Sequence, residues 1–300
     1  MKQPLVSIVS VCWNRKNEIH ESLLRIREID YPNLEIIVVD NASTDGTATM
    51  IESVFPEVRL LHMPENSGVA AYNAGFKTAQ GEYIVILDDD SFPHQDSLKR
   101  MVKKFENDPS LGVVAFDVRN FYNYDDVKNE TIETGENLET VAAAKDYLLA
   151  FNGAGAGVRR EALEQAGFYP EEFFLYWNEQ DTAFRILDKG YDIQFFSDVV
   201  AYHKFSPLNR SSRRAPFYYT RNAFWLIWKN YPSGMSLNLT LRFIHDCLYS
   251  TLEQSTSVYL QAMLAAFVNI GKLQGKRKPV KPDIARKLRI PLNLAFTFYR

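Results

Sequence analysis

Three consecutive aspartates directly follow a short apolar run in the first third of the chain. Residues 84–87 read Ile-Val-Ile-Leu, and residues 88–90 are all Asp. An unbroken apolar run of this length is typical of a strand that is buried on both faces, as in a parallel sheet. Three carboxylates at the end of such a strand repel one another and destabilise the fold unless a cation lies beside them. We therefore predict a Mg²⁺ or Mn²⁺ site here, because both ions prefer oxygen ligands; a solvated acidic turn is the alternative.

Strand-like and helix-like segments alternate through the first 116 residues. Apolar runs that predict strands lie at 5–12, 34–39, 58–62, 83–87 and 112–116. Segments that predict helices lie between them, at 17–29, 47–55, 69–78 and 97–107. Repeated β-α-β units predict an α/β fold, with a mostly parallel sheet flanked by helices. Open α/β sheets bind ligands at the carboxyl ends of their strands, which is where the three aspartates lie.

The second half of the chain has a less regular pattern. Polar residues dominate from 117 to 149, where we expect an irregular segment. A glycine-rich turn at 151–157 then leads into a helix at 160–166. Such a turn lets the backbone approach a ligand closely, although an ordinary connection explains it equally well. The elements predicted further on are a helix at 180–189, strands at 192–196 and 199–203, an aromatic-rich helix at 216–231, and one long helix with an apolar stripe over 237–270.

Positive charge is concentrated in the last third of the chain. Residues 201–300 hold 16 Lys and Arg and three acids, whereas the whole chain has a net charge of −3. This asymmetry suggests two functions, and the polar, basic stretch at 207–214 marks a boundary between a domain at 1–206 and a basic helical region at 207–300. The basic region can bind an anionic membrane surface, or its apolar stripe can pack on the N-terminal domain or on a second copy in a homodimer. Nucleic acid is not expected as a partner, because the aromatic residues of this region follow the helical spacing of a core.

The cysteine content gives an expectation for the cellular compartment. The two cysteines, Cys12 and Cys247, lie far apart in sequence and match no metal-binding spacing. We expect a cytoplasmic protein without disulfides, which is peripheral on the inner face of the membrane if the basic region binds lipid. The apolar segment 258–270 is too short to span a bilayer.

A set of sequence motifs follows in a definite order. They are Cys-Trp-Asn-Arg at 12–15, Val-Asp-Asn-Ala-Ser-Thr-Asp-Gly at 39–46, Asn-Ser-Gly at 66–68, Asn-Ala-Gly at 73–75, the Asp triplet at 88–90, Asn-Gly-Ala-Gly at 152–155, Asn-Glu-Gln-Asp at 178–181 and Tyr-His at 202–203. Together they closely resemble the family 2 inverting glycosyltransferases, which have the GT-A nucleotide-diphospho-sugar transferase fold. The resemblance covers about residues 4–231.

This resemblance implies a site for a nucleoside diphosphate sugar, with Mn²⁺ or Mg²⁺ as cofactor. The residues that it places against the donor are Cys12, Trp13, Asn14, Arg15, Asp40, Asn66, Gly68, Asn73, Asp88 and Asp89. The residues that it assigns to the metal are Asp90, Asp88 and His203. The residues that correspond to a loop at the donor and acceptor are Asn152, Gly153, Ala154, Gly155 and Trp177. Because Asp40 can accept the imide N–H of uracil or thymine, a UDP or dTDP donor is favoured.

Inversion by a single displacement requires a base on the face opposite the leaving group. The family usually has Glu-Asp-x-Asp at the start of a helix, and this chain has Asn-Glu-Gln-Asp in that register. Glu179 therefore stands at the position of the family's base, where Glu replaces the usual Asp. Asp181 is the second candidate, although it lies four residues before Arg185 and can pair with it on one helical face. A helix N-terminus also favours a carboxylate through its dipole, which gives Glu179 a structural alternative.

Other classes of protein also combine strands with an acidic cluster. A phosphatase with an aspartyl nucleophile, or a receiver domain, has its key Asp after an early strand, whereas this triplet follows the fourth predicted strand. A nucleotidyltransferase normally has a glycine-rich loop after the first strand, and residues 14–17 contain no glycine. A catalytically inactive, sugar-nucleotide-binding scaffold protein is a further alternative. We expect a metal-dependent, inverting glycosyltransferase that acts on a glycan or lipid-linked acceptor in cell-surface polysaccharide biosynthesis.

Overall fold

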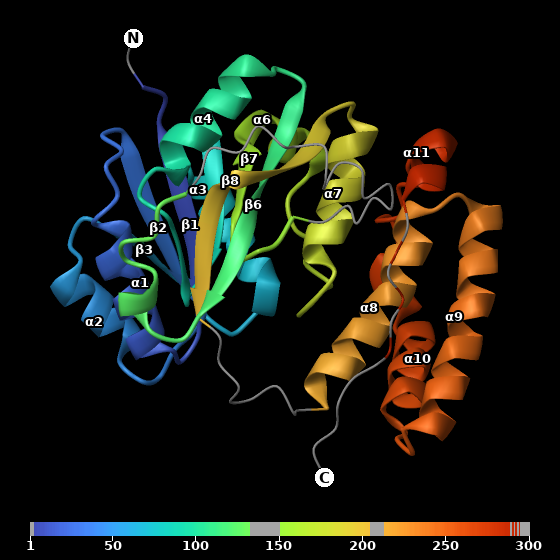
Figure 1. Ribbon diagram of the computed structural model, residues 1–300. Helices are drawn as coiled ribbons and strands as arrows, with labels where there is room; N and C mark the ends of the chain where they lie inside the picture. The colour runs from blue at the N-terminus through green and yellow to red at the C-terminus, as the bar shows by residue number, and fades with distance from the viewer. Residues whose placement is uncertain are drawn as a thin grey trace.

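A single sheet forms the centre of the N-terminal part of the protein (Figure 1). The computed structural model describes residues 3–132, 151–204 and 213–288, together with 290, 292 and 294. The strands are β1 (Val6–Cys12), β2 (Leu34–Asp40), β3 (Arg59–His62), β4 (Tyr83–Asp88), β5 (Ser91–Pro93), β6 (Leu111–Phe121), β7 (Ala156–Arg159) and β8 (Asp192–Lys204). Their order is β3-β2-β1-β4-β7-β6-β8-β5. All neighbours pair in parallel except for β7, which is antiparallel to β4 and β6, and β5, which is antiparallel to β8.

Alternate side chains of β4 contact two separate layers of helices. Tyr83, Val85 and Leu87 belong to one buried cluster, and Ile84 and Ile86 belong to another. The first cluster includes residues of α1 (Lys16–Ile26), α2 (Thr47–Val54) and α4 (Ser97–Asn107). The second includes residues of α3 (Tyr72–Thr78), α6 (Arg160–Ala166) and α7 (Asn178–Asp188). The apolar run of β4 is therefore buried on both faces, and the predicted α/β fold with a mostly parallel, helix-flanked sheet is confirmed.

Two strands were not expected from the sequence. Strand β7 begins in the last two residues of the glycine-rich segment 151–157, which was predicted to be a turn that leads directly into α6, and it continues to Arg159. A Cβ on Gly157 would lie 2.2 Å from Met101 Sδ, so the strand can pack against α4 only because it carries glycine there. Strand β5 directly follows the Asp triplet, and its Ser91 pairs with His203 of β8.

Strand β8 corrects a second prediction. Two separate strands were expected at 192–196 and 199–203, but β8 is continuous over 192–204. In the pairing of β8 with β6, Phe116 lies opposite Phe196, but the next residue, Asp117, lies opposite Val200. The break in the apolar pattern is therefore an irregularity within one continuous strand. Strand β6 likewise extends beyond its predicted end, to Phe121, into the segment that was expected to be irregular. Residues 133–150 of that segment lie outside the described residues.

A second group of helices follows the sheet at the right of Figure 1. The helices are α8 (Arg214–Asn230), α9 (Ser233–Glu253), α10 (Val258–Val268) and α11 (Pro282–Lys287), with short 3₁₀ helices elsewhere at η1 (Gly68–Ala71), η2 (Tyr124–Asp126) and η3 (Ile270–Leu273). The single long helix predicted over 237–270 is wrong, because polar residues at 254–257 separate α9 from α10 and Ser255 has a φ of 48°. These helices share a third buried cluster, to which Phe173, Trp177 and Phe184 also belong.

The predicted boundary between residues 206 and 207 lies outside the described residues, so the division into two domains stays a prediction. None of the helices in the described parts of the chain is long and apolar enough to cross a membrane.

Candidate active site

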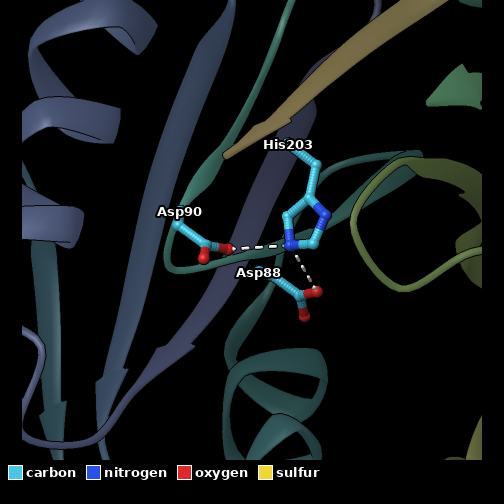
Figure 2. A group of neighbouring side chains, drawn as sticks. All are labelled: Asp88, Asp90 and His203. Atoms are coloured by element: carbon cyan, nitrogen blue, oxygen red, sulfur yellow. Dashed lines mark ion pairs between the residues drawn. The ribbon is translucent and has the colours of Figure 1, made fainter. Parts of the chain in front are cut away.

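The aspartate triplet and His203 meet through the pairing of two short strand ends. Asp88 ends β4, and the chain turns at Asp89 and Asp90 into β5. Because Ser91 of β5 lies opposite His203 of β8, the imidazole is brought to the triplet. His203 Nε2 lies 3.0 Å from Asp90 Oδ1 and 3.8 Å from Asp88 Oδ2 (Figure 2). A strand that the sequence did not predict therefore assembles this cluster.

The donor atoms of this cluster suit a divalent cation. One ligand atom from each of Asp88, Asp90 and His203 can be chosen such that all three lie within 4.8 Å of one another. Two carboxylate oxygens and an imidazole nitrogen form a donor set that Mn²⁺ accepts, and Mg²⁺ accepts the oxygens. The residues present therefore fit the predicted metal, and their role as its ligands stays a prediction.

Arg15 supplies a fixed positive charge beside the triplet. Its Nε lies 3.2 Å from Asp89 Oδ1, and its Nη2 donates a hydrogen bond of 2.5 Å to Asp90 Oδ2. Burial raises the pKa of Asp89 well above its usual value, although Arg15 opposes this rise. Burial alone would also raise the pKa of Asp90, but His203 and Arg15 outweigh it and lower that pKa. Three adjacent carboxylates are thus tolerated because a guanidinium and an imidazole lie against them.

A cavity of about 790 Å³ opens beside this cluster. Residues that the sequence predicted at the donor and that line the cavity are Cys12, Trp13, Arg15, Asn66, Gly68, Asp88 and Asp89, and the metal candidates Asp90 and His203 line it too. Gly68 is needed at this point, because its φ is +62° and a Cβ there would lie 1.9 Å from the carbonyl oxygen of Phe174. The volume lies within the range of about 300–1,000 Å³ that is usual for small-molecule sites.

Further lining residues were not predicted. They are Val11, Asn41, Val69, Tyr72, Phe174, Leu175, Tyr176, Lys204, Arg214 and Ala215. The hydroxyl of Tyr72 donates to Leu87 O at 2.9 Å and to Asp88 Oδ1 at 3.3 Å, so it holds the end of β4. Lys204 and Arg214 are cations, and the position of Lys204 directly after His203 was a signal that could have been used. Arg214 begins α8, beyond the last of the sequence motifs, which is at 202–203.

The ends of β1 and β2 fix each other beside the cavity. Asp40 is buried, and its Oδ2 accepts a hydrogen bond of 3.3 Å from the backbone N–H of Ser43. The Cys12 thiol lies 4.0 Å from Asp40 Oδ1, and burial raises the pKa of this thiol, so it stays protonated. Asn14 Oδ1 accepts the backbone N–H of Thr44 at 2.7 Å. The two loops are therefore joined, while contacts of Asp40 and Asn14 with a nucleotide stay predictions.

Glu179 lies near Asp88, at the start of α7. A Cβ built on Gly153 would lie 2.6 Å from Glu179 Oε1 and 3.8 Å from Asp88 Oδ1. A larger residue at position 153 would therefore require the Glu179 carboxylate to move, while an approach of this turn to a ligand stays a prediction. Burial raises the pKa of Glu179 to about 7, and the negative charge of Asp88 contributes to the rise. A carboxylate with such a pKa can accept a proton near neutral pH.

Asp181 lies on the same helix in a different environment. It is fully buried, and its Oδ2 forms an ion pair of 2.8 Å with Arg185, as the i,i+4 spacing suggested. Its Oδ1 lies 3.1 Å from Lys229 Nζ and accepts a hydrogen bond of 2.8 Å from Asn230. Burial alone would raise the pKa of Asp181, but Lys229 and Arg185 outweigh it and lower that pKa. Both carboxylate oxygens thus have cationic or amide partners within the protein.

The remaining predicted residues contact backbone groups. Asn73 exchanges two hydrogen bonds of 2.9 Å with the backbone of Tyr169. Asn152 Oδ1 accepts the backbone N–H of Ala154 at 3.0 Å, and its carbonyl accepts that of Gly155 at 3.0 Å. Trp177 is buried, and its indole N–H donates to Tyr219 O at 2.8 Å. None of these residues is among those that line the cavity, and their contact with a donor or an acceptor stays a prediction.

Comparisons with known sequences agree with the predicted family. The family model described as "Glycosyl transferase family 2" matches residues 7–167, more than half of the chain. Glycosyltransferase AglE of Haloferax volcanii is 26% identical over 214 residues, which cover 68% of this chain and 68% of the relative. Poly-beta-1,6-N-acetyl-D-glucosamine synthase of Staphylococcus aureus is 25% identical over 198 residues, which cover 63% of this chain and 47% of the relative. The chain thus spans about two thirds of the first relative and about half of the second.

Comparisons with solved structures concern the fold. The mannosyltransferase PcManGT from Pyrobaculum calidifontis, in complex with GDP-Man and Mn²⁺, aligns with a TM-score of 0.60 at 24% identity, covering 91% of this chain and 75% of that chain. Residues 1–349 of Staphylococcus aureus TarS, in complex with UDP-GlcNAc, align with a TM-score of 0.61 at 17% identity, covering 86% of this chain and 79% of that chain. These similarities confirm the predicted GT-A fold.

Proposed function

Because the chain belongs to glycosyl transferase family 2, we propose that it is a metal-dependent, inverting glycosyltransferase. Its donor is a nucleoside diphosphate sugar of the UDP or dTDP type, and its acceptor is a glycan or a lipid-linked glycan. The observation that carries this proposal is the position of Glu179, a carboxylate with a pKa of about 7, near the cluster of Asp88, Asp90 and His203. A single displacement requires a base for the acceptor hydroxyl and stabilisation of the leaving diphosphate, and Glu179 and the neighbouring cluster can supply the two.

The proposed reaction is a single displacement at the anomeric carbon. Glu179 accepts the proton of the acceptor hydroxyl as the hydroxyl oxygen forms a bond to that carbon. The bond from the carbon to the diphosphate oxygen breaks at the same time, and its electron pair leaves with the nucleoside diphosphate. The new glycosidic bond therefore has the opposite anomeric configuration to the donor. A general base typically contributes about 10²–10⁴-fold to such a rate.

The other residues position and neutralise the donor. Asp88, Asp90 and His203 would hold Mn²⁺ or Mg²⁺, which would supply positive charge for the leaving diphosphate. Asp40 accepts the imide N–H of a pyrimidine base, and Trp13, which is 42% exposed at the cavity, stacks on that base. The cations Lys204 and Arg214, which also line the cavity, add positive charge for a diphosphate.

Relatives support a role in the synthesis of polysaccharides. One is named as a synthase of poly-beta-1,6-N-acetyl-D-glucosamine, and two structural neighbours were solved with the donors GDP-Man and UDP-GlcNAc. These two donors carry different bases, so the pyrimidine preference rests on Asp40 and the sugar is left unassigned. The proposed site of action is the cytoplasmic face of a membrane, where a lipid-linked acceptor is accessible.

Donor binding is tested by thermal shift with UDP, dTDP and GDP sugars, each with and without Mn²⁺. A donor at 100 times its Kd stabilises the protein by about 2.7 kcal/mol. Asp90→Ala should abolish both the Mn²⁺-dependent stabilisation and sugar transfer, whereas Asp126→Ala, which removes an exposed acid on η2, should change neither. Turnover that persists in Asp90→Ala with a chelator would show that the reaction needs no metal. Retention of the donor's anomeric configuration, measured by NMR of the product, would exclude the single displacement.

A further inference from the structure

Large apolar side chains are exposed along α9 and α10. Of the thirteen that are exposed in the described parts of the chain, nine lie between residues 237 and 270. Four of them form a row on α9, here called the leucine stripe, with exposed fractions of 62%, 60%, 47% and 80% for Leu237, Leu241, Leu248 and Leu252. Exposed apolar residues normally occur singly on a soluble protein, and a continuous row indicates a contact surface.

The inner face of α9 is more polar than this outer row. The residues of α9 that are buried are Ser236, Thr240, Phe243, Cys247 and Ser250. Helix α9 packs against α8 and α10, and Thr240 Oγ1 accepts a hydrogen bond of 2.9 Å from the indole of Trp228 on α8. Met235, Leu239 and Ile244 of α9 also pack against the buried cluster of the C-terminal helices. The leucine stripe is therefore a second apolar face on a helix whose inner face is already packed, and a lipid surface can cover it. In Figure 1, α9 lies at the outer edge of the molecule.

Positive charge accompanies the exposed apolar residues. Between residues 233 and 288 the chain holds eight Lys and Arg and three acids. Val268 and Ile270, at the end of α10 and in η3, are 81% and 52% exposed, and Lys272 follows two residues later. Lys276 and Lys278 are exposed as well, and Lys276 Nζ pairs with Glu172 at 3.0 Å. A second copy that docked through this basic region would bring like charges together, whereas an anionic surface complements them.

We propose that the α9–α10 hairpin docks on an anionic lipid bilayer. The leucine stripe enters the boundary between headgroups and acyl chains, and Lys272, Lys276 and Lys278 lie against lipid phosphates. Since no described helix can span a membrane, the hairpin lies on the surface. Figure 1 shows that α9 ends at the same end of the molecule as the start of α8, whose Arg214 lines the cavity.

Co-sedimentation of the purified full chain with vesicles tests this proposal. One set of vesicles is phosphatidylcholine alone, and the other is phosphatidylcholine and phosphatidylglycerol in equal parts. We expect binding to the anionic set only, and weaker binding as salt rises, since the screening length falls from about 10 Å at 0.1 M to about 3 Å at 1 M. Replacement of Lys272, Lys276 and Lys278 by Gln should weaken partitioning roughly a hundredfold, at about fivefold for each cation.

A second variant replaces Leu237, Leu241, Leu248 and Leu252 by Gln, and it should lose at least about tenfold in partitioning because the apolar insertion is removed. The matched control removes the same amount of charge from exposed cations of the sheet domain, by replacing Arg59, Lys103 and Lys189 with Gln, and it should bind as the wild type does. Unchanged melting temperatures show that the variants fold.

Three outcomes would overturn the proposal. The first is a wild-type protein that stays in the supernatant with anionic vesicles at low salt. The second is equal loss of binding in the control, because general positive charge would then be sufficient. The third is a dimer, measured by light scattering, that the Leu→Gln variant dissociates, because a second copy would then cover the stripe.

Discussion

Lys229 Nζ lies 3.1 Å from Asp181 Oδ1, and this ion pair joins α8 to α7 in the interior of the protein. Lys229 also lies 2.7 Å from Glu172 Oε1. The proposed base Glu179 lies two residues before Asp181 on the same helix. The ion pair therefore ties the helix that carries the proposed base to the C-terminal helices.

Loss of this ion pair should destabilise the protein strongly. In Lys229→Met, Asp181 and Glu172 lose a buried cationic partner, and breaking a buried pair typically costs about 3–5 kcal/mol. The matched variant Lys276→Met removes an exposed partner of the same Glu172 and should cost about 0–1 kcal/mol. Urea unfolding of the two variants measures the difference, and similar losses in both would contradict a structural role for Lys229.

Glu179→Gln keeps the size of the side chain and removes its capacity to accept a proton. We expect kcat to fall by about 10²–10⁴-fold while the Kd of the donor stays nearly unchanged. Glu161→Gln on α6, which changes an exposed carboxylate, should leave both constants as they are. Steady-state kinetics and donor titrations provide the measurement. Equal losses in kcat and in donor affinity would make Glu179 a binding or structural residue instead of a base.

The raised pKa of Glu179 predicts a pH dependence with a definite sign. Because the base must be ionised, kcat/KM should fall about tenfold for each pH unit below roughly 7. The folded pKa also exceeds the unfolded one, so ionisation favours unfolding, and stability should decrease as the pH rises toward 7. Glu179→Gln should abolish this part of both profiles. If the residual activity of Glu179→Gln still falls in the same way at low pH, another group is responsible for that fall.

Gly153→Ala should impair the same carboxylate without changing its chemistry. The added methyl group would lie 2.6 Å from Glu179 Oε1, so the side chain must move. We expect a loss of kcat with little change in donor affinity. Gly234→Ala on α9, where an added Cβ meets nothing within 4 Å, is the control. Wild-type turnover in Gly153→Ala would show that Glu179 need not stay where the structure has it.

Arg15 should oppose metal binding when no donor is present, because it neutralises Asp89 and Asp90. Arg15→Met should therefore lower the Mn²⁺ concentration needed for half-maximal thermal stabilisation several-fold, since charge repulsion in the triplet then favours a bound cation. Arg27→Met, which breaks an exposed pair with Glu57, serves as the control. An unchanged Mn²⁺ titration in Arg15→Met would separate Arg15 from the metal site.

Much of the α/β architecture could be read from the sequence, because its signals are local. The apolar run before the aspartates and the alternation of strands with helices depend on residues that are close along the chain. The motif at 39–46 and the Asp triplet identified the family for the same reason. Helices α4 and α6 have the predicted bounds, since each is a short amphipathic segment between clear turns.

The elements that were missed depend on contacts between distant segments. Strand β7 has only four residues, one of them glycine, and it is a strand because it pairs with β4 and β6, which are distant in sequence. Strand β5 has three residues and exists by pairing with β8. Cations such as Arg214 reach the cavity from helices beyond the motifs.

The candidate site likewise combines features that local sequence shows with features that depend on contacts between distant segments. The residue types of the site can be read from the sequence: a triplet of carboxylates, a late histidine, and two acids at the start of α7. Their environments cannot, because a pKa or an ion pair depends on what surrounds a group in the folded protein. Glu179 and Asp181 are two residues apart on one helix, yet burial near Asp88 raises the pKa of the first, and Lys229 and Arg185 lower that of the second.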